Sequence, residues 1–432
     1  MKVAYVCALV LGGMLLWGAH SEAQDKPDTR AKPGAAQSGD TKKQDGTKAE
    51  GASGQKTDTA KATPPTAADL NSRARALIGQ QKYEDAIVLL KQAIALEKNN
   101  IESHVELALA YNGAKRFNEA AKEFRAAVEL NPQRASFHDG LGGTLMELGK
   151  YAEARTEFER AQELEPSEIT YRIEIGDTYM QEKDYLAAYS AYLKALGYAP
   201  DNPRVHLLLA DADEQLSRHA DALEEYETAL RLDHNNLGAM LGRATALTGL
   251  KRYAEAEKIM RDLVAKSPKE ASVHSGLAQV LDSAGKHTEA IAEYNAALAI
   301  TADDPILWGN LGWAQYNAGL MDDSVKSSRK ALELDSKLTY VRLNLGLVYA
   351  VRDRWNEAQK EYAQAVAGAA ASDIHSGIND VRDAMAKGKP NNALKKALDY
   401  LTASEWKAMG LPEATQPGTA PRPSKTLGSC SL

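Results

Sequence analysis

The stretch that decides the fold is AAKEFRAAVELNP, residues 120–132, because it returns at a fixed interval. Shifted by 34 residues it reads ARTEFERAQELEP at 154–166, AYSAYLKALGYAP at 188–200 and ALEEYETALRLDH at 222–234. An alanine, an aromatic residue and a second alanine keep their places in all four copies. A fixed period of this length indicates a stack of equal units rather than one globular core.

The remainder of each unit repeats as well. A large residue followed by a small one recurs in the first half, at Leu107-Ala108, Leu141-Gly142, Ile175-Gly176, Leu209-Ala210, Leu277-Ala278, Leu311-Gly312 and Leu345-Gly346. An aromatic residue opens the second half at Tyr83, Phe117, Tyr151, Tyr185, Tyr253 and Trp355. Units that begin at 67, 101, 135, 169, 203, 237, 271, 305 and 339 run to 372 without insertion or deletion.

Each unit is predicted to be a helix-turn-helix. Apolar and small positions fall three and four residues apart, which places them on one face of a helix. Gly149, Gly285 and Gly319 stand between the halves, where a left-handed residue can end the first helix. Alanine methyl groups let neighbouring helices approach closely, and stacking of units then forms the core. The eighth unit has Met321, Ser324 and Ser328 where an aromatic residue, an alanine and an aromatic residue are expected, so we expect looser packing and a soft point there.

This pattern resembles the tetratricopeptide repeat, and the resemblance covers residues 67–372. It implies an all-α, right-handed α-solenoid of nine 34-residue helix-turn-helix repeats whose concave wall is built mainly from the first helix of each unit. The sequence after 372 still predicts a helix pair, at 373–402, which we interpret as the polar cap that a solenoid needs at its end. The resemblance also implies a scaffold that binds a protein or peptide, rather than an enzyme.

Composition and charge agree with this interpretation. The 432 residues carry 52 basic and 59 acidic side chains, a net charge of −7, and only 6 % are aromatic. A mildly acidic chain has no general attraction for phosphate backbones, so nucleic acid is not expected as a partner. No nucleophile, phosphate-loop or dinucleotide motif is present, and we expect no cofactor.

The two ends of the chain predict features outside the repeats. Residues 1–23 are typical of a signal peptide, with Lys2, an uncharged run from Val3 to Trp17, and cleavage after Ala23. We therefore expect a periplasmic or secreted protein. The alternative is that the N-terminal segment stays uncleaved and anchors the protein in the inner membrane, and only in that case do we expect contact with a membrane. Residues 24–66 are predicted to be a disordered linker, and 403–432, with four prolines, a disordered tail.

The resemblance implies that positions two, five, six, nine, twelve and thirteen of each unit face the groove. An acidic stretch and an apolar pocket occupy these positions: Asp139, Asp177 and Asp211, then Trp313, Tyr316, Tyr340, Leu343 and Leu347. Aromatic anchors carry much of the affinity at interfaces, and charges set specificity. The alternative is that Tyr316 and Leu347 pack against the cap helices and that the acids form a solvated face.

Two further sets of residues share a unit position. Asn310 and Asn344 stand at position six of adjacent units, where side-chain amides could clamp the main chain of an extended peptide; a helix-surface amide without a ligand is the alternative. Position four holds His104, His138, His206 and His274. Equivalent positions lie a whole unit apart, too far to share a metal ion, so we interpret these histidines as packing residues and expect no metal site.

These observations predict a partner-binding scaffold in the bacterial envelope, acting as an assembly or adaptor factor. Two alternatives remain open from the sequence. The array could self-associate as a structural homodimer, or it could serve as an accessory subunit of a carbohydrate-export or glycan-transfer machine.

Overall fold

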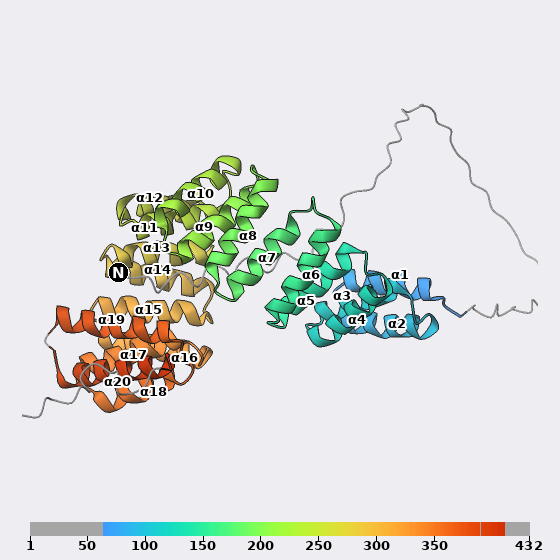
Figure 1. The fold of residues 1–432 in the computed structure, drawn as a ribbon. Coiled ribbons are helices and arrows are strands. Elements are labelled where there is room, and N and C mark those ends of the chain that lie inside the picture. The colour runs from blue at the N-terminus through green and yellow to red at the C-terminus, as the bar shows by residue number, and fades with distance from the viewer. Residues whose placement is uncertain (1–63, 389, 411–432) are drawn as a thin grey trace, which may run out of the picture. The chain divides into compact units, whose positions relative to one another are not determined.

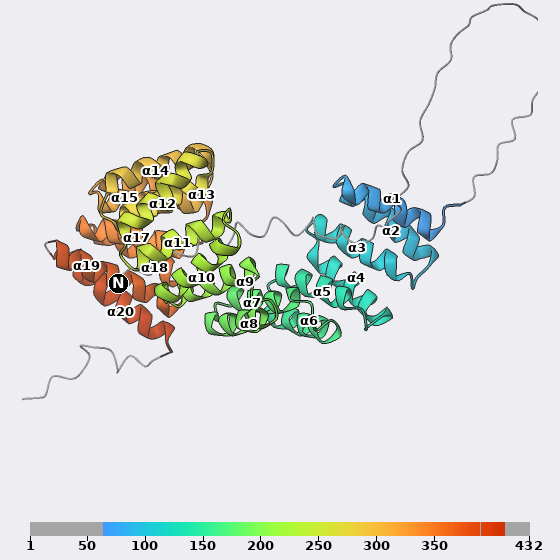
Figure 2. The same ribbon diagram turned by 90° about the horizontal axis from the view of Figure 1, so that it is seen from above.

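The computed structural model describes residues 64–388 and 390–410. Within these residues the chain forms helices and connecting turns, without a strand, and Figures 1 and 2 show successive helices stacked in pairs. The predicted signal peptide, nearly all of the predicted linker and residues 411–432 lie outside the described part. The all-helical repeat fold predicted from the sequence is confirmed.

The odd-numbered helices up to α17 each open a repeat and are called A helices here. They are α1 (Ala67–Gly79), α3 (Ile101–Gly113), α5 (Ala135–Glu147), α7 (Thr170–Gln181), α9 (Pro203–Gln215), α11 (Leu237–Gly249), α13 (Ala271–Ser283), α15 (Pro305–Asn317) and α17 (Thr339–Val351). The even-numbered B helices close each repeat. They are α2 (Tyr83–Leu96), α4 (Phe117–Leu130), α6 (Tyr151–Leu164), α8 (Tyr185–Tyr198), α10 (His219–Leu232), α12 (Tyr253–Lys266), α14 (His287–Ile300), α16 (Met321–Leu334) and α18 (Trp355–Val366).

The predicted register agrees with these bounds. The six aromatic residues that open the second half of a unit are each the first residue of a B helix. Eight A helices begin at the predicted unit start, and α7 begins one residue later. The alanines of the quoted stretches, such as Ala120, Ala127, Ala154 and Ala161, are completely buried. Their methyl groups lie where helices touch, as the packing argument requires.

The turn between the A and B helices has the same backbone in all nine repeats. Residue fifteen of each unit adopts a positive φ, between 57° and 81°. Glycine occupies this place at Gly149, Gly285 and Gly319; the other repeats hold Gln81, Lys115, Lys183, Ser217, Lys251 and Asp353. A left-handed conformation costs a residue with a Cβ roughly 1–2 kcal/mol, so six of the turns are locally strained.

This turn provides the first prediction. Changing Gly285 to alanine is expected to lower the free energy of unfolding by about 1 kcal/mol, because φ is +81° there although no atom would crowd the new Cβ. Changing Ser217, at φ 58°, to glycine should raise stability by a few tenths of a kcal/mol. Urea unfolding followed by circular dichroism measures both. Equal effects of the two changes would show that the turn conformation does not control stability.

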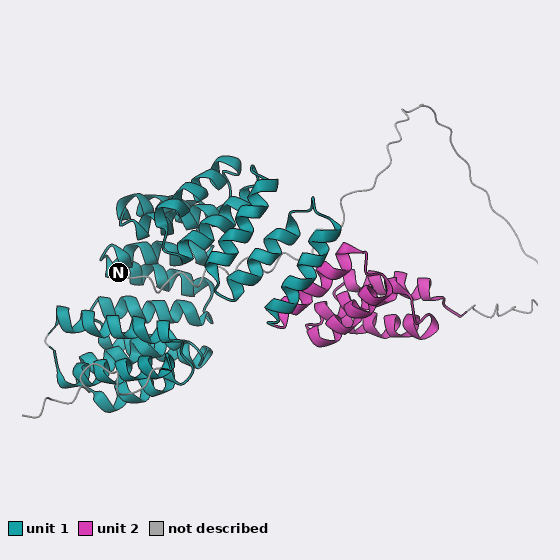
Figure 3. Cartoon of the chain, in the orientation of Figure 1, with its two compact units in different colours: residues 1–9, 149–432 teal, residues 10–148 magenta. Residues whose placement is uncertain are grey.

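The chain divides into two compact units, coloured in Figure 3. Among the described residues, unit 2 runs from 64 to 148 and holds α1 to α5, and unit 1 runs from 149 and holds α6 to α20. The boundary falls at the turn inside the third repeat. In unit 2, Leu90, Leu107 and Tyr111 belong to the largest of its buried clusters. In unit 1, one cluster spans α11 to α15 and another spans α17 to α20.

Helix α16 lies between these two clusters of unit 1. Its buried face holds Ser324, Ser327 and Ser328, together with Ala331. The Ser324 hydroxyl donates to the Gly312 carbonyl at 2.6 Å, which satisfies the buried oxygen without adding apolar contact. The predicted soft point thus coincides with an interruption of the apolar core; its lower stability stays a prediction.

The cap consists of α19 (Ala371–Lys387) and α20 (Asn392–Ala408). The predicted boundary at 402 is wrong, because α20 continues for six residues beyond it. Leu401 and Glu405 are buried, and Glu405 pairs with His375 of α19 at 2.7 Å. The last turns of α20 therefore pack as part of the cap and do not belong to a disordered tail.

In the described part of the chain, no helix combines the length and apolar character needed to cross a bilayer.

Candidate functional site on the A-helix wall

The candidate site is the face of the A helices that carries positions two, five, six, nine, twelve and thirteen, called here the A-helix wall. In unit 1 successive A helices from α9 to α17 contact each other directly. From α9 to α17, each position therefore forms a row, with one side chain from each of these repeats. The rows hold most of the residues predicted to bind a partner.

The acidic part of the wall has a recurring hydrogen bond. Tyr192 in α8 donates its hydroxyl to Asp177 Oδ1 in α7 at 2.6 Å. One repeat later, Tyr226 in α10 donates to Asp211 Oδ1 in α9 at 2.7 Å. Both tyrosine rings are buried, and each passes between helices so that its hydroxyl reaches the wall.

Burial dominates the electrostatics of these carboxyls. It raises the pKa of Asp211 to about 6, against the opposing hydrogen bond from Tyr226, and the charges of Glu214 and Asp177 add to the increase. Burial also raises the pKa of Asp177, while the Tyr192 hydrogen bond and the charge of Arg204 lower it. The two aspartates are thus partly desolvated groups, and within the part of the chain that the structure describes neither has a strong cationic partner.

Two more acids lie close by on α9. Glu214 and Asp213 are almost completely buried; His219 pairs with Glu214 at 3.1 Å and Arg218 with Asp213 at 3.4 Å. Burial raises the pKa of Asp213 to about 6 and also raises that of Glu214. Asp139, the remaining predicted acid, is half-buried on α5 and belongs to unit 2. The predicted acidic stretch is therefore divided between the units.

Sequence analysis overlooked the two tyrosines as members of the site. The signal was available: an aspartate followed fifteen residues later by a tyrosine occurs at Asp177 and Tyr192, and again one repeat later. The aspartate is at position nine of the unit, in the A helix, and the tyrosine is at position twenty-four, in the B helix. Because these two positions meet at the wall, the spacing of fifteen residues predicts the hydrogen bond between them.

The predicted apolar pocket is largely filled by the protein itself. Leu343 and Leu347 of α17 are 5 % and 2 % exposed, and they belong to a cluster with Ile374, Ile378 and Val381 of α19. Trp313 and Tyr316 of α15 are half-buried against the same cluster, with ring centroids 5.2 Å apart. Tyr316 and Leu347 thus pack in one cluster with cap residues, as the alternative interpretation of the sequence proposed.

The remaining predicted residues are also mostly covered. Asn310 and Asn344 are each 6 % exposed, which leaves little amide surface for a peptide backbone. Tyr340 is half-buried and extends over Gly309 of α15, where a Cβ would lie 2.8 Å from its hydroxyl oxygen. Burial, followed by the charges of Asp304 and Asp335, raises the pKa of Tyr340. Partner binding by these residues stays a prediction.

The position-four histidines have a structural role. In each, Nε2 lies 2.8–3.1 Å from the main-chain oxygen six residues earlier, in His104, His138, His206 and His274. Nδ1 of His104, His206 and His274 contacts a B-helix carboxylate, of Glu123, Glu225 and Glu293 respectively. Trp308 uses its indole nitrogen in the same way, donating to the Ala302 oxygen at 2.8 Å. Across residues 64–388 and 390–410, histidine, cysteine and acidic side chains form no group of three suited to a metal ion.

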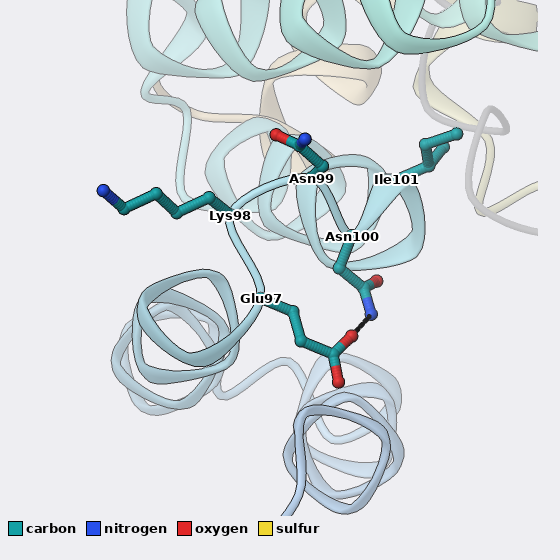
Figure 4. A pocket seen from close by; sticks show the side chains of 5 residues that line it. All are labelled: Glu97, Lys98, Asn99, Asn100 and Ile101. Atoms are coloured by element: carbon teal, nitrogen blue, oxygen red, sulfur yellow. Dashed lines mark hydrogen bonds between the residues drawn. The ribbon is translucent and has the colours of Figure 1, made fainter.

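A hollow of about 590 Å³ lies away from the wall, at the turn between α2 and α3 (Figure 4). Its lining comes from one short segment, Glu97 to Ile101, and the side chains of Lys98 and Asn99 point outward (Figure 4). Asn100 donates to Glu97 Oε2 at 2.7 Å, which leaves both groups engaged within the turn. We assign no function to this hollow.

Comparison with known proteins identifies the family. Models described as tetratricopeptide repeat match residues 77–142, 111–172, 173–236, 215–280 and 306–338, and one described as TPR repeat matches 283–319. Together they cover more than half of the chain. The chain belongs to the tetratricopeptide repeat family. Proteins built from tetratricopeptide repeats generally bind protein or peptide partners, and the fold typically serves as a non-enzymatic scaffold.

Similarity to individual proteins is more limited. Superkiller complex protein 3 of Mus musculus is 33 % identical over 79 residues, which is 18 % of this tetratricopeptide repeat protein and 5 % of the mouse protein. The Homo sapiens protein of the same name is 28 % identical over 131 residues, or 28 % of this chain and 8 % of that one. The chain thus spans less than a tenth of these relatives.

A solved structure supports the fold. The tetratricopeptide repeat protein from Parabacteroides merdae ATCC 43184 is 19 % identical, with a TM-score of 0.53 over 57 % of this chain and 98 % of that chain. At this identity the likeness concerns the fold alone.

Proposed function

We propose that this protein is a non-enzymatic scaffold that binds a protein or peptide partner along the A-helix wall of unit 1, and that basic residues of the partner meet Asp177 and Asp211. The observation that carries the proposal is the pair of desolvated carboxylates, each held by a tyrosine hydroxyl at the same position of adjacent repeats. Hydrogen bonds fix their orientation, while no cationic group of the described residues forms an ion pair with either carboxylate.

A cationic side chain would supply what this part of the wall lacks. A lysine or arginine of the partner placed beside Asp211 would lower the pKa of that carboxyl and form a charge-assisted hydrogen bond. Such bonds contribute more than neutral ones, about 1.5–3 kcal/mol each. The spacing of one repeat between the two aspartates favours an extended or helical segment with two basic residues.

The setting we propose is the bacterial envelope, with export directed by residues 1–23 and cleavage after Ala23, and with an assembly or adaptor role. The charge pattern of the N-terminal segment supports this. Cell fractionation and N-terminal sequencing of the mature protein test it. Recovery of the intact N-terminus from the cytosol would contradict export.

The carboxylates give the test of partner binding. Affinity capture from envelope extract, quantified by mass spectrometry, is compared for the unchanged protein and for the double variant Asp177→Asn, Asp211→Asn. We expect at least tenfold lower recovery of the partner with the variant, because two charge-assisted bonds are lost. Binding should also strengthen as the pH rises through about 6, since Asp211 ionises in that range.

The matched control is Asp262→Asn, which removes a carboxylate from the exposed face of α12. It should capture the partner as the unchanged protein does. If the double variant and the control recover the same proteins in the same amounts, the carboxylates do not bind the partner.

A further inference from the structure

The fourth residue of the repeat makes the same two polar contacts in several repeats. In repeat five, His206 Nε2 lies 2.8 Å from the Pro200 main-chain oxygen, and Nδ1 lies 2.6 Å from Glu225 Oε2 of α10. His104 and His274 have the same arrangement, with a main-chain oxygen six residues earlier and a B-helix glutamate nineteen residues later. The arrangement therefore recurs in repeats two, five and seven.

These contacts determine how many protons the ring of His206 carries. A carbonyl oxygen accepts hydrogen bonds and cannot donate, so Nε2 carries a proton. An ionised carboxylate also only accepts, so Nδ1 carries a proton as well. A ring with protons on both nitrogens is positively charged, and its hydrogen bond to Glu225 is charge-assisted.

Repeat nine holds a permanent cation in the same place. Arg342 donates from Nε to the Ser336 oxygen at 3.3 Å and from Nη1 to Glu361 Oε2 at 3.3 Å. These partners are again six residues earlier and nineteen residues later. Arg172 of repeat four makes the first of the two contacts, to the Pro166 oxygen at 2.8 Å. The side chain of Arg342 is only 18 % exposed, so this position accommodates a largely buried cation.

The other charges near the His206–Glu225 pair are mainly negative. On the side of α8, burial and three carboxylates raise the pKa of Tyr189, and one guanidinium lowers it; these groups are Asp213 of α9, Glu225 and Asp221 of α10, and Arg218 of the α9–α10 turn. Arg243, the one charged residue of α11, pairs with Glu227 of α10 at 3.2 Å. Three carboxylates outweigh one guanidinium, so the surroundings favour a positive ring.

His206 is a clearer case than His104. In repeat two, Lys91 of α2 and Lys122 of α4 line a hollow of about 280 Å³ together with His104 and Glu123. The residues three repeats later, at 193 and 224, are leucine and glutamate. The two lysines that compete for the glutamate in repeat two thus have no counterpart in repeat five.

We propose that position four of the repeat is a cation site, that His206 occupies it as an imidazolium ion, and that loss of this proton at alkaline pH weakens the contact of α9 with α10. A neutral ring directs the Nδ1 lone pair at the Glu225 carboxylate, so the attraction becomes a repulsion. The stabilisation is complete below about pH 6.5, where histidine of an unfolded chain is also protonated, and it is lost as the pH rises and the folded ring releases its proton.

Nuclear magnetic resonance of the full chain labelled with ¹⁵N-histidine tests the protonation state. The His206 signals are identified by their loss in His206→Gln. At pH 7 we expect the doubly protonated ring of His206 in at least about tenfold excess over the neutral ring, whereas neutral rings predominate in the urea-unfolded chain. Glu225→Gln should convert the folded ring to the neutral form. A neutral His206 ring in the unchanged protein at pH 7 would overturn the proposal.

Thermal unfolding at pH 6 and pH 8.5 tests the consequence for α9. His206→Arg copies Arg342 and keeps the cation at both pH values. Its unfolding midpoint should match that of the unchanged protein at pH 6 and exceed it by about 1–3 °C at pH 8.5. A difference of the same size at both pH values would mean that no titrating cation occupies position four.

The matched control is His234→Arg, an exposed position in the turn between α10 and α11, which should leave the midpoint unchanged at both pH values. Should circular dichroism show that His206→Arg does not fold, Glu225→Gln provides the second measurement. It should lower the midpoint at pH 6, where it removes the ion pair, and should not lower it at pH 8.5. An equal loss at both pH values would contradict the proposal.

Discussion

Replacing Gly242 with alanine is expected to lower the free energy of unfolding by about 1–3 kcal/mol, although alanine is the better helix former. A Cβ at this position would lie 2.3 Å from Cε1 and Cζ of Tyr226. The ring cannot move aside easily, because it is 2 % exposed and its hydroxyl is bonded to Asp211. The α10–α11 contact must therefore open, which weakens the stacking of the fifth repeat on the sixth.

The control is Gly197→Ala in α8. Gly197 is also helical, but no atom lies within 4 Å of its would-be Cβ. Here only helix propensity changes, so stability should rise by about 0.5–1 kcal/mol. Chemical unfolding of the two variants should thus show midpoints displaced in opposite directions. A Gly242→Ala protein as stable as the unchanged one would mean that the tyrosine can repack.

Replacing Asp211 with asparagine is expected to stabilise the protein by about 1–2 kcal/mol near pH 7. The pKa of Asp211 is about 6 in the folded state and about 3.9 in an unfolded chain. Because the folded protein holds the proton more tightly, stability falls as the pH rises from about 4 to about 6 and is then constant. Asparagine avoids the burial of a charge and keeps an oxygen to accept the Tyr226 hydrogen bond.

The gain should disappear at about pH 4, where aspartate at this position is already protonated in the folded protein. Urea unfolding at both pH values measures it, with Asp262→Asn as the control for removal of an exposed charge. A gain of the same size at both pH values would exclude the buried charge as its cause. Combined with the capture experiment, the variant also distinguishes stability from function: Asp211→Asn should fold better and bind its partner less well.

Much of the fold was predictable because the repeat makes local and global signals agree. Tyr83 and Phe117 mark the starts of B helices, and Gly149 marks a left-handed turn, as predicted. The other turns were less visible, because residues such as Lys183 and Asp353 adopt the same φ without being glycine. There the contacts of the two flanking helices override the local preference of the residue.

The site was predicted less completely. The wall positions of Asp177 and Asp211 followed from the resemblance, but their burial and their tyrosine partners depend on how the B helix inserts its ring. Both rings lie against a glycine of a neighbouring A helix: Tyr192 against Gly176 of its own repeat, and Tyr226 against Gly242 of the next. The sequence contains both glycines, but no local pattern shows that a tyrosine ring of a B helix lies against them.

The number of repeats, their register and the type of each helix follow from the amino-acid sequence, because these depend on a period that recurs along the chain. Which wall residues remain accessible depends instead on how distant helices pack. Trp313, Leu343 and Leu347 appear as an open apolar surface until α19 is placed against them. That contact joins segments whose pairing is governed by the fit of Gly377 against Leu343 and the loss of apolar surface to water, and neither is encoded in a local pattern.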